Sequence, residues 1–102
     1  MSHAIEMTVL RLAEGLAIDD FIAANADINA WIQQQPGFIA RRICERDDGA
    51  IVDIVIWQTA KDGHRSACAI MTEMGQSPVH GTIDHRAVEW TIATVRQAIG
   101  ST

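Results

Sequence analysis

The feature that most restricts the fold is the stretch FIARRICERDDGAIVDIVIWQ, residues 38–58, in which two β-rich runs flank the dipeptide Asp48-Gly49. An Asp-Gly pair between two such runs is among the strongest short signals for a β-hairpin. We place the turn at residues 47–50. The stretch therefore predicts two neighbouring antiparallel strands of one sheet.

The hairpin has two unlike faces, because side chains alternate along a strand. One face carries the aliphatic row Val52, Ile54 and Ile56, which we expect to lie beneath helices. The other face mixes apolar and charged side chains: Phe38, Ala40, Arg42, Cys44, Ile51, Asp53, Val55 and Trp57. A solvated face would not carry so many large apolar groups, so we expect this second face to be covered by something other than the helices.

The rest of the chain supplies another strand and a helix on each side of the hairpin. Residues 5–12 and 87–97 have the pattern of strands, whereas residues 17–35 and 59–74 have apolar side chains at helical spacing. Thr59 and Asp62 resemble a capping box before the second helix. The order β-α-β-β-α-β predicts a ferredoxin-like α+β fold, an antiparallel sheet with both helices on one face. It occupies residues 1–102 as a single domain.

Charge, apolar runs and cysteine content limit the binding partners and the cellular compartment that we expect. The formal net charge of −5 argues against a nucleic-acid groove, which needs a basic stripe. No apolar run approaches the length of a membrane span, and the first residues contain no signal-peptide core, so we expect a soluble, cytoplasmic protein. Two cysteines fit a reducing compartment better than a disulfide scaffold.

The apolar share is 48%, and counting the 7 glycines brings it to roughly 55%, above the about 45–50% of ordinary domains. Surplus apolar side chains in a small domain are often buried between subunits. The simplest cover for the sheet face without helices is a second copy of the same sheet. We therefore expect a homodimer.

Three segments carry a resemblance to a known family: PGFIARR (36–42), VDIVIW (52–57) after the Asp-Gly turn, and IDHRAVEW (83–90). Together they resemble the antibiotic-biosynthesis-monooxygenase group of dimeric α+β barrels, including its bacterial members without an assigned reaction. The resemblance implies a dimeric α+β barrel and, in one branch, quinone-forming monooxygenation without a cofactor. The haem-degrading branch uses a first-strand asparagine together with a tryptophan and a histidine on the second helix. This chain lacks that set, so we reject haem degradation.

The resemblance carries the strand tryptophan of the quinone-forming branch over to Trp57. This side chain either fills the barrel mouth or stacks on a planar aromatic substrate. Arg42 and Asp53 are diagonal neighbours on its face, either as a buried ion pair or as groups that orient a ligand carbonyl or carboxylate. Phe38 and Trp90 are further candidates for contact with a ligand.

His64 lies seven residues after Trp57, on the predicted second helix. It is either a packing histidine or a general base near the cavity mouth, since an imidazole exchanges protons near neutral pH. The remaining histidines and the cysteines have no metal-ligand spacing, so we predict no metal site. Strand alternation alone leaves the face of Glu6 open. We predict that Asp53 and Trp57 face the lumen between two sheets, and that His64 lies outside it or at its rim.

Three functions compete. The chain is a cofactor-independent monooxygenase acting on an aromatic or polyketide-like molecule, a dimer that binds such a molecule unchanged, or a structural dimer with a packed lumen. An empty pocket of roughly 300 Å³ or more would favour the first two. Oxygen uptake would separate the first from the second.

Overall fold

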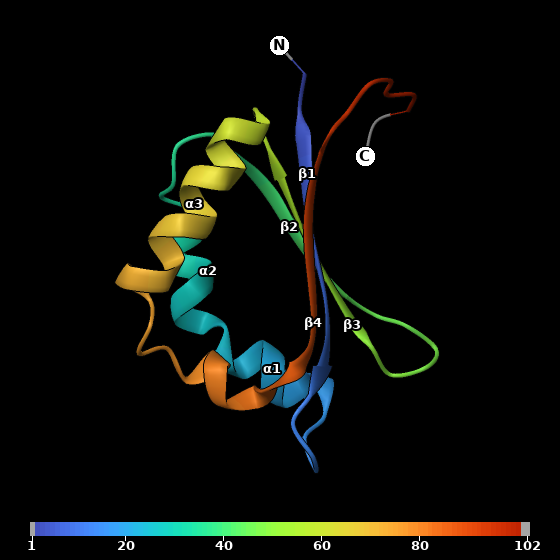
Figure 1. The fold of residues 1–102 in the computed structure, drawn as a ribbon, viewed down its shortest axis with the longest axis vertical. Coiled ribbons are helices and arrows are strands. Elements are labelled where there is room, and N and C mark those ends of the chain that lie inside the picture. Colours follow the sequence, from blue (N-terminus) through green and yellow to red (C-terminus); the bar gives the residue numbers. More distant parts are fainter. Residues whose placement is uncertain (1, 101–102) are drawn as a thin grey trace.

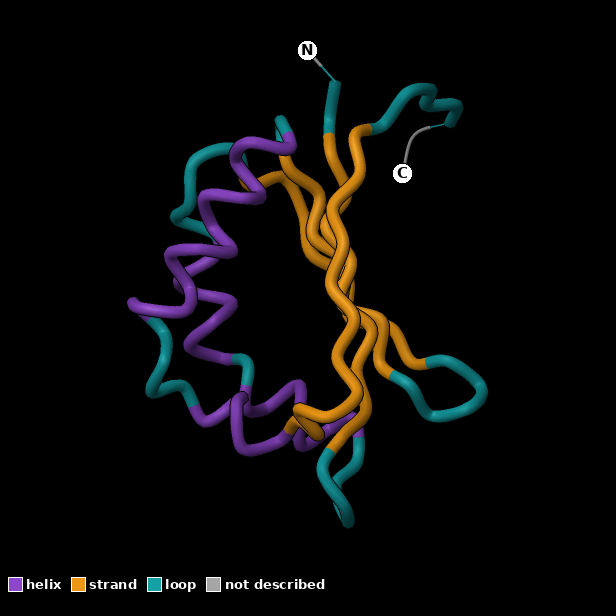
Figure 2. Tube along the Cα trace, in the orientation of Figure 1, coloured by secondary structure: helices purple, strands orange, loops and turns teal. Residues whose placement is uncertain are grey.

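Four strands form one antiparallel sheet in the computed structural model, which describes residues 2–100. Along the chain, the elements are β1 (Ala4–Leu12), α1 (Ile18–Ala24), α2 (Ala26–Ile32), β2 (Phe38–Glu45), β3 (Ile51–Trp57), α3 (Ala60–Glu73), the 3₁₀ helix η1 (Pro78–Thr82) and β4 (Ile83–Thr94). The strand order is β2-β3-β1-β4. The helices all lie on one face of the sheet (Figures 1 and 2), which confirms the ferredoxin-like α+β fold. None of the helices in residues 2–100 is long and apolar enough to span a membrane.

The first helical segment is two short helices rather than the single helix expected over residues 17–35. The break lies at Asn25, whose buried side chain donates from Nδ2 to the Phe21 carbonyl oxygen at 2.8 Å. Asparagine side chains compete with the helical backbone for such hydrogen bonds. Helix α1 buries Phe21 and α2 buries Ile28 in one core cluster, and α2 also buries Ile32 in a second cluster.

The prediction of which hairpin face lies under the helices is wrong. Trp57 is 0% exposed and packs against Gly63 of α3, where an added Cβ would stand 2.9 Å from the Trp57 Cδ1 atom. The aliphatic row Val52, Ile54 and Ile56 is only half-buried and lies on the bare face. Both faces are apolar enough to pack under helices. A large indole gains more by complete burial, and the glycine provides the space for it.

The hairpin loop is one residue shorter than the expected four-residue turn at residues 47–50. The Arg46 N–H donates to the Ala50 carbonyl oxygen at 2.8 Å, and Gly49 has a φ of +86°. This is a three-residue loop that ends in a left-handed glycine and a bulge. In the resulting register, Arg42 pairs with Ile54 and Ile43 pairs with Asp53.

A register shift of one residue moves every side chain of β2 to the other face of the sheet. Arg42 is therefore exposed on the bare face, and the predicted pair of Arg42 with Asp53 does not form. Its neighbour Arg41 takes that place on the helix face. A second irregularity between Phe38 and Ala40 returns Phe38 to the face of Trp57, where their rings meet edge to face at 6.0 Å.

Two clusters of buried residues lie between sheet and helices. Leu10, Phe21, Ile28, Ile51 and Val79 form one, and Ile32, Val55 and Trp57 form the other. The polar pair Thr8 and Asp53 lies on the helix face at the strand positions between the two clusters.

Candidate functional site

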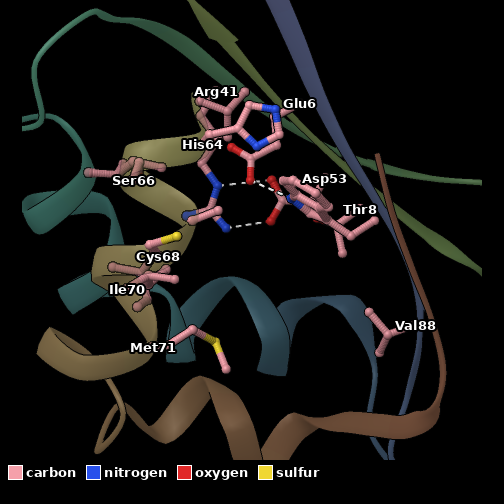
Figure 3. A pocket seen from close by; sticks show the side chains of 15 residues that line it. Glu6, Thr8, Arg41, Asp53, His64, Ser66, Cys68, Ile70, Met71 and Val88 are labelled. Atoms are coloured by element: carbon pink, nitrogen blue, oxygen red, sulfur yellow. Dashed lines mark hydrogen bonds and ion pairs between the residues drawn. The ribbon is translucent and has the colours of Figure 1, made fainter. Parts of the chain in front are cut away.

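An open cleft of about 600 Å³ lies between the helix face of the sheet and the helices α2 and α3. Its walls are mostly apolar, with Ile28 and Ile32 from α2, Ile70 and Met71 from α3 and Val88 from β4. Its polar groups are Glu6, Thr8, Arg41, Asp53, His64, Ser66 and Cys68 (Figure 3). The cavity is therefore inside one chain, whereas the sequence predicts a lumen between two sheets.

A four-residue polar network forms one end of this cleft. Arg41 donates to Asp53 through two bonds, from Nε to Oδ1 at 3.0 Å and from Nη2 to Oδ2 at 2.6 Å. It also donates from Nη1 to Asn29 Oδ1 at 2.8 Å and from Nη2 to Asn25 Oδ1 at 2.9 Å. The two charged side chains are only 10% and 13% exposed. The network ties the α1–α2 break to strands β2 and β3 and neutralises Asp53.

Glu6 lies on the central strand β1 and has two tryptophan partners. Trp57 donates from Nε1 to one carboxylate oxygen at 2.9 Å, and Trp90 donates from Nε1 to the other at 2.7 Å. The carboxylate is half-buried and lines the cleft. Two indoles from opposite neighbouring strands therefore hold both oxygens of one acid.

The mouth of the cleft is aromatic and apolar. The His64 imidazole meets the Trp90 indole edge to face, with ring centroids 5.6 Å apart. Trp90 is 42% exposed and Met71 is 73% exposed, and both line the cleft. A flat apolar molecule entering here would cover side chains that water now covers.

The described residues contain no cluster of three histidine, cysteine, aspartate or glutamate side chains with the geometry of a metal site. The polar groups of the cleft are instead suited to hydrogen bonding and proton transfer, because carboxylates and imidazoles accept and donate protons. The free thiol of Cys68 lies on the exposed flank of α3 beside them.

Comparison with solved structures adds the fold relatives. SnoaB, a cofactor-independent oxygenase from Streptomyces nogalater, matches with a TM-score of 0.75 at 16% identity, covering 99% of this chain and 100% of that chain. A monooxygenase from the gene ActVA-Orf6 of Streptomyces coelicolor, in complex with the ligand nanaomycin D, matches with a TM-score of 0.63 at 15% identity, covering 99% and 94%. The chain has the fold of the antibiotic-biosynthesis monooxygenases. No protein-family model matches the sequence, and no curated protein is significantly similar to it.

The monooxygenase-type fold brings three of the predicted site residues together. Asp53, His64 and Trp90 all line the cleft. Trp57 lies beneath its floor, with no exposed surface to offer a planar ligand, and Phe38 packs against it. Arg42 is on the far face of the sheet.

Sequence reasoning missed Arg41 and left Glu6 unplaced. The signal for Glu6 was the alternation of β1, which puts Glu6 on the same face as the apolar residues Ala4 and Leu10. Both of these residues are buried in the structure. The signal for Arg41 was weaker, because either Arg41 or Arg42 could pair with Asp53 until the length of the hairpin loop fixes the register.

Proposed function

We propose that this protein is a cofactor-independent monooxygenase acting on a planar aromatic, polyketide-like molecule. The observation that carries the proposal is the mostly apolar cleft of about 600 Å³, which has an exposed indole at its mouth and a carboxylate held on its floor. A cleft of this volume lies in the range of small-molecule sites. The names of the two solved structures above support the same class of reaction.

The chemistry needs a substrate that is readily oxidised once it loses a proton. An enol such as the hydroxyl tautomer of anthrone gives its proton to a base and one electron to oxygen, which leaves a ring radical and superoxide. The two recombine to form a carbon–oxygen bond. The hydroperoxide formed after reprotonation loses water and leaves a quinone carbonyl. One oxygen atom enters the product and the other leaves as water, so no external reductant is required.

Different side chains of the cleft stack on the substrate, exclude water and accept the proton. The Trp90 ring offers an exposed face for stacking on the substrate. The apolar walls exclude water from the electron-rich anion, which strengthens its interactions with the site. Arg41 and Asp53 hold the helices against the sheet and present a neutral polar surface. The base is either His64, which the sequence suggests, or Glu6, which the structure adds.

Oxygen uptake tests the proposal, with anthrone as the substrate and the protein-free rate subtracted. We expect one molecule of oxygen to be consumed per molecule of anthraquinone formed, with label from isotopic oxygen in the new carbonyl. Trp90→Ala should slow the reaction, whereas Glu89→Gln, on the opposite face of β4, should leave its rate unchanged. Binding of anthraquinone without any protein-dependent oxygen uptake would instead make the protein a binding module.

We also propose that the protein is a homodimer joined through the bare face of the sheet. That face carries Ile5, Met7, Val9, Val52, Ile54 and Ile56, all of them half-buried or exposed in a single chain. Monomeric proteins rarely leave so large an apolar strip in water. The interface is thus the aliphatic row, in place of the tryptophan face expected from the sequence.

A further inference from the structure

Glu6 is an acidic side chain on the floor of an apolar cleft. Its neighbours across the sheet are Val55 on β3 and Ile92 on β4. Removing a charge from water costs several kcal/mol unless other groups replace the water. Within residues 2–100, Glu6 has no ion-pair partner, so its replacements for water are the two indole N–H groups.

Those two hydrogen bonds fix the carboxylate and leave part of it open. An indole N–H only donates, so each of the two carboxylate oxygens must act as an acceptor. An ionised carboxylate accepts about four hydrogen bonds, and the indoles occupy two of these positions. Because Glu6 lines the cleft, the remaining positions are available to a hydroxyl of a bound molecule.

The other acid and the imidazole of the cleft are less suited to that contact. Asp53 is ion-paired with the Arg41 guanidinium through two bonds, and this cation compensates its charge and makes it a poorer proton acceptor. His64 is exposed, and its ring packs edge to face against the Trp90 indole, which is itself 42% exposed. Of these three cleft side chains, Glu6 is the one that combines fixed placement, a carboxylate without an ion-pair partner in residues 2–100, and contact with the cleft.

We propose that the Glu6 carboxylate accepts the hydrogen bond of a ring hydroxyl on the bound molecule, and that it takes the proton of this hydroxyl during the oxygenation. The second half rests on the proposed function. Trp57 and Trp90 are then positioning residues, since they hold both oxygens from neighbouring strands. The ligand class is thereby narrowed to flat aromatics that carry a hydroxyl group.

The proton and the electron leave the substrate together. An ordinary carboxylate is too weak a base to ionise a phenol outright, but a ring that loses an electron to oxygen becomes strongly acidic. The O–H bond breaks as oxygen is reduced to superoxide, and Glu6 becomes a neutral acid. Glu6 then returns this proton to the peroxide formed by recombination, which restores its carboxylate.

A binding experiment tests the hydroxyl contact without any turnover. The ligands are 2-hydroxyanthraquinone and 2-methoxyanthraquinone, titrated against tryptophan fluorescence. A hydrogen bond to a charged group predicts that the wild-type protein prefers the hydroxyl ligand about tenfold or more. Glu6→Gln should reduce that preference to near unity, and Glu89→Gln should keep it.

Each outcome of the titration decides the matter. Equal binding of the two ligands by the wild-type protein, or binding of neither, overturns the proposal even if the Glu6→Gln variant does not fold. A preference that survives Glu6→Gln overturns it as well. If the preference depends on Glu6 but the wild type consumes no oxygen with anthrone, the proposed function fails and the hydroxyl contact stands.

The pH profile of oxygen uptake tests the proton transfer. We expect Glu6→Gln to lower the rate with anthrone about 100-fold at neutral pH. The deficit should shrink as the pH rises and anthrone ionises in solution, because an anion needs no base. The other charged groups facing the cleft, His64 on α3, Asp53 on β3 and Arg41 on β2, are present in both proteins. A deficit equal at every pH would assign Glu6 a structural role and overturn the proton transfer.

Discussion

Arg41 and Arg42 are adjacent in the chain and have opposite environments. The Arg41 guanidinium makes four hydrogen bonds to side chains on α1, α2 and β3 or at their ends. Arg42 lies exposed on the bare face, where its guanidinium contacts only the Arg41 carbonyl oxygen in the described part of the chain. We therefore expect Arg41, and not Arg42, to contribute to the free energy of unfolding.

Arg41→Ala should lower the free energy of unfolding by about 3 kcal/mol or more, because it leaves Asp53 as an unpaired charge in a shielded place. Arg42→Ala should change it by less than about 0.5 kcal/mol, as is usual for exposed positions. Urea denaturation of the two variants measures the difference. A larger loss for Arg42→Ala than for Arg41→Ala would instead favour the register expected from the sequence, and equal losses would contradict the Arg41 network.

Asp84 at the start of β4 provides a titration that can be followed directly. Hydrogen bonds from the Arg86 side chain and backbone lower the pKa of its carboxyl to about 2. Because the folded-state value is below the ordinary one, this interaction favours the fold above about pH 4 and is lost as the pH falls towards 2. Arg86→Ala should raise the pKa of Asp84 part of the way to 3.8, since the backbone donor stays.

Carboxyl carbon shifts in an NMR titration report this change. Arg42→Ala is the matched control, because it removes an arginine from the opposite edge strand. A pKa for Asp84 that is the same with and without the Arg86 guanidinium would contradict the assignment.

At the scale of elements, the packing of α3 against the sheet depends on the absence of a side chain at Gly63. Helix α3 begins after Thr59, whose hydroxyl accepts from the Asp62 N–H at 3.2 Å, as the capping pattern predicts. One turn later, Gly63 is buried against Trp57 and Ile92. The glycine therefore sets how closely the helix that carries His64 approaches the floor of the cleft.

Gly63→Ala should lower the free energy of unfolding by about 1–3 kcal/mol, the usual cost of overpacking. Alanine alone would favour the helix by about 1 kcal/mol, so a loss reports the clash with the rigid indole. Gly81→Ala is the control, since a Cβ there meets nothing within 4 Å. A Gly63→Ala protein as stable as the wild type would show that α3 does not rest on Trp57.

At the scale of the whole molecule, the sheet has one face covered by helices and one face bare (Figure 2). The cleft and the proposed interface are therefore on opposite faces. A second copy on the bare face would leave the mouth of the cleft open, so binding and assembly can be tested separately.

Ile54→Lys, on the bare face between Met7 and Arg42, should convert the proposed dimer into a monomer, because it puts a second cation beside Arg42 in a sheet-to-sheet interface. Sedimentation velocity at micromolar concentration measures this. Ala30→Lys, on the exposed side of α2, should leave the dimer intact. A wild-type protein that sediments as a monomer would sink the dimer proposal.

The sequence alone determined the order of the strands and helices, the caps and the fold class, because these depend on local periodicity and on turn residues a few positions apart. Only the tertiary structure decided which face of the hairpin meets the helices. Both faces are apolar, and the choice came from the fit of Trp57 against Gly63 across the sheet. The arginine that pairs with Asp53 was likewise decided by the loop at Gly49, since one residue of slip exchanges Arg42 for Arg41. Glu6 gained its role only when two distant tryptophans were brought to its two oxygens by strand pairing, a juxtaposition that no local pattern encodes.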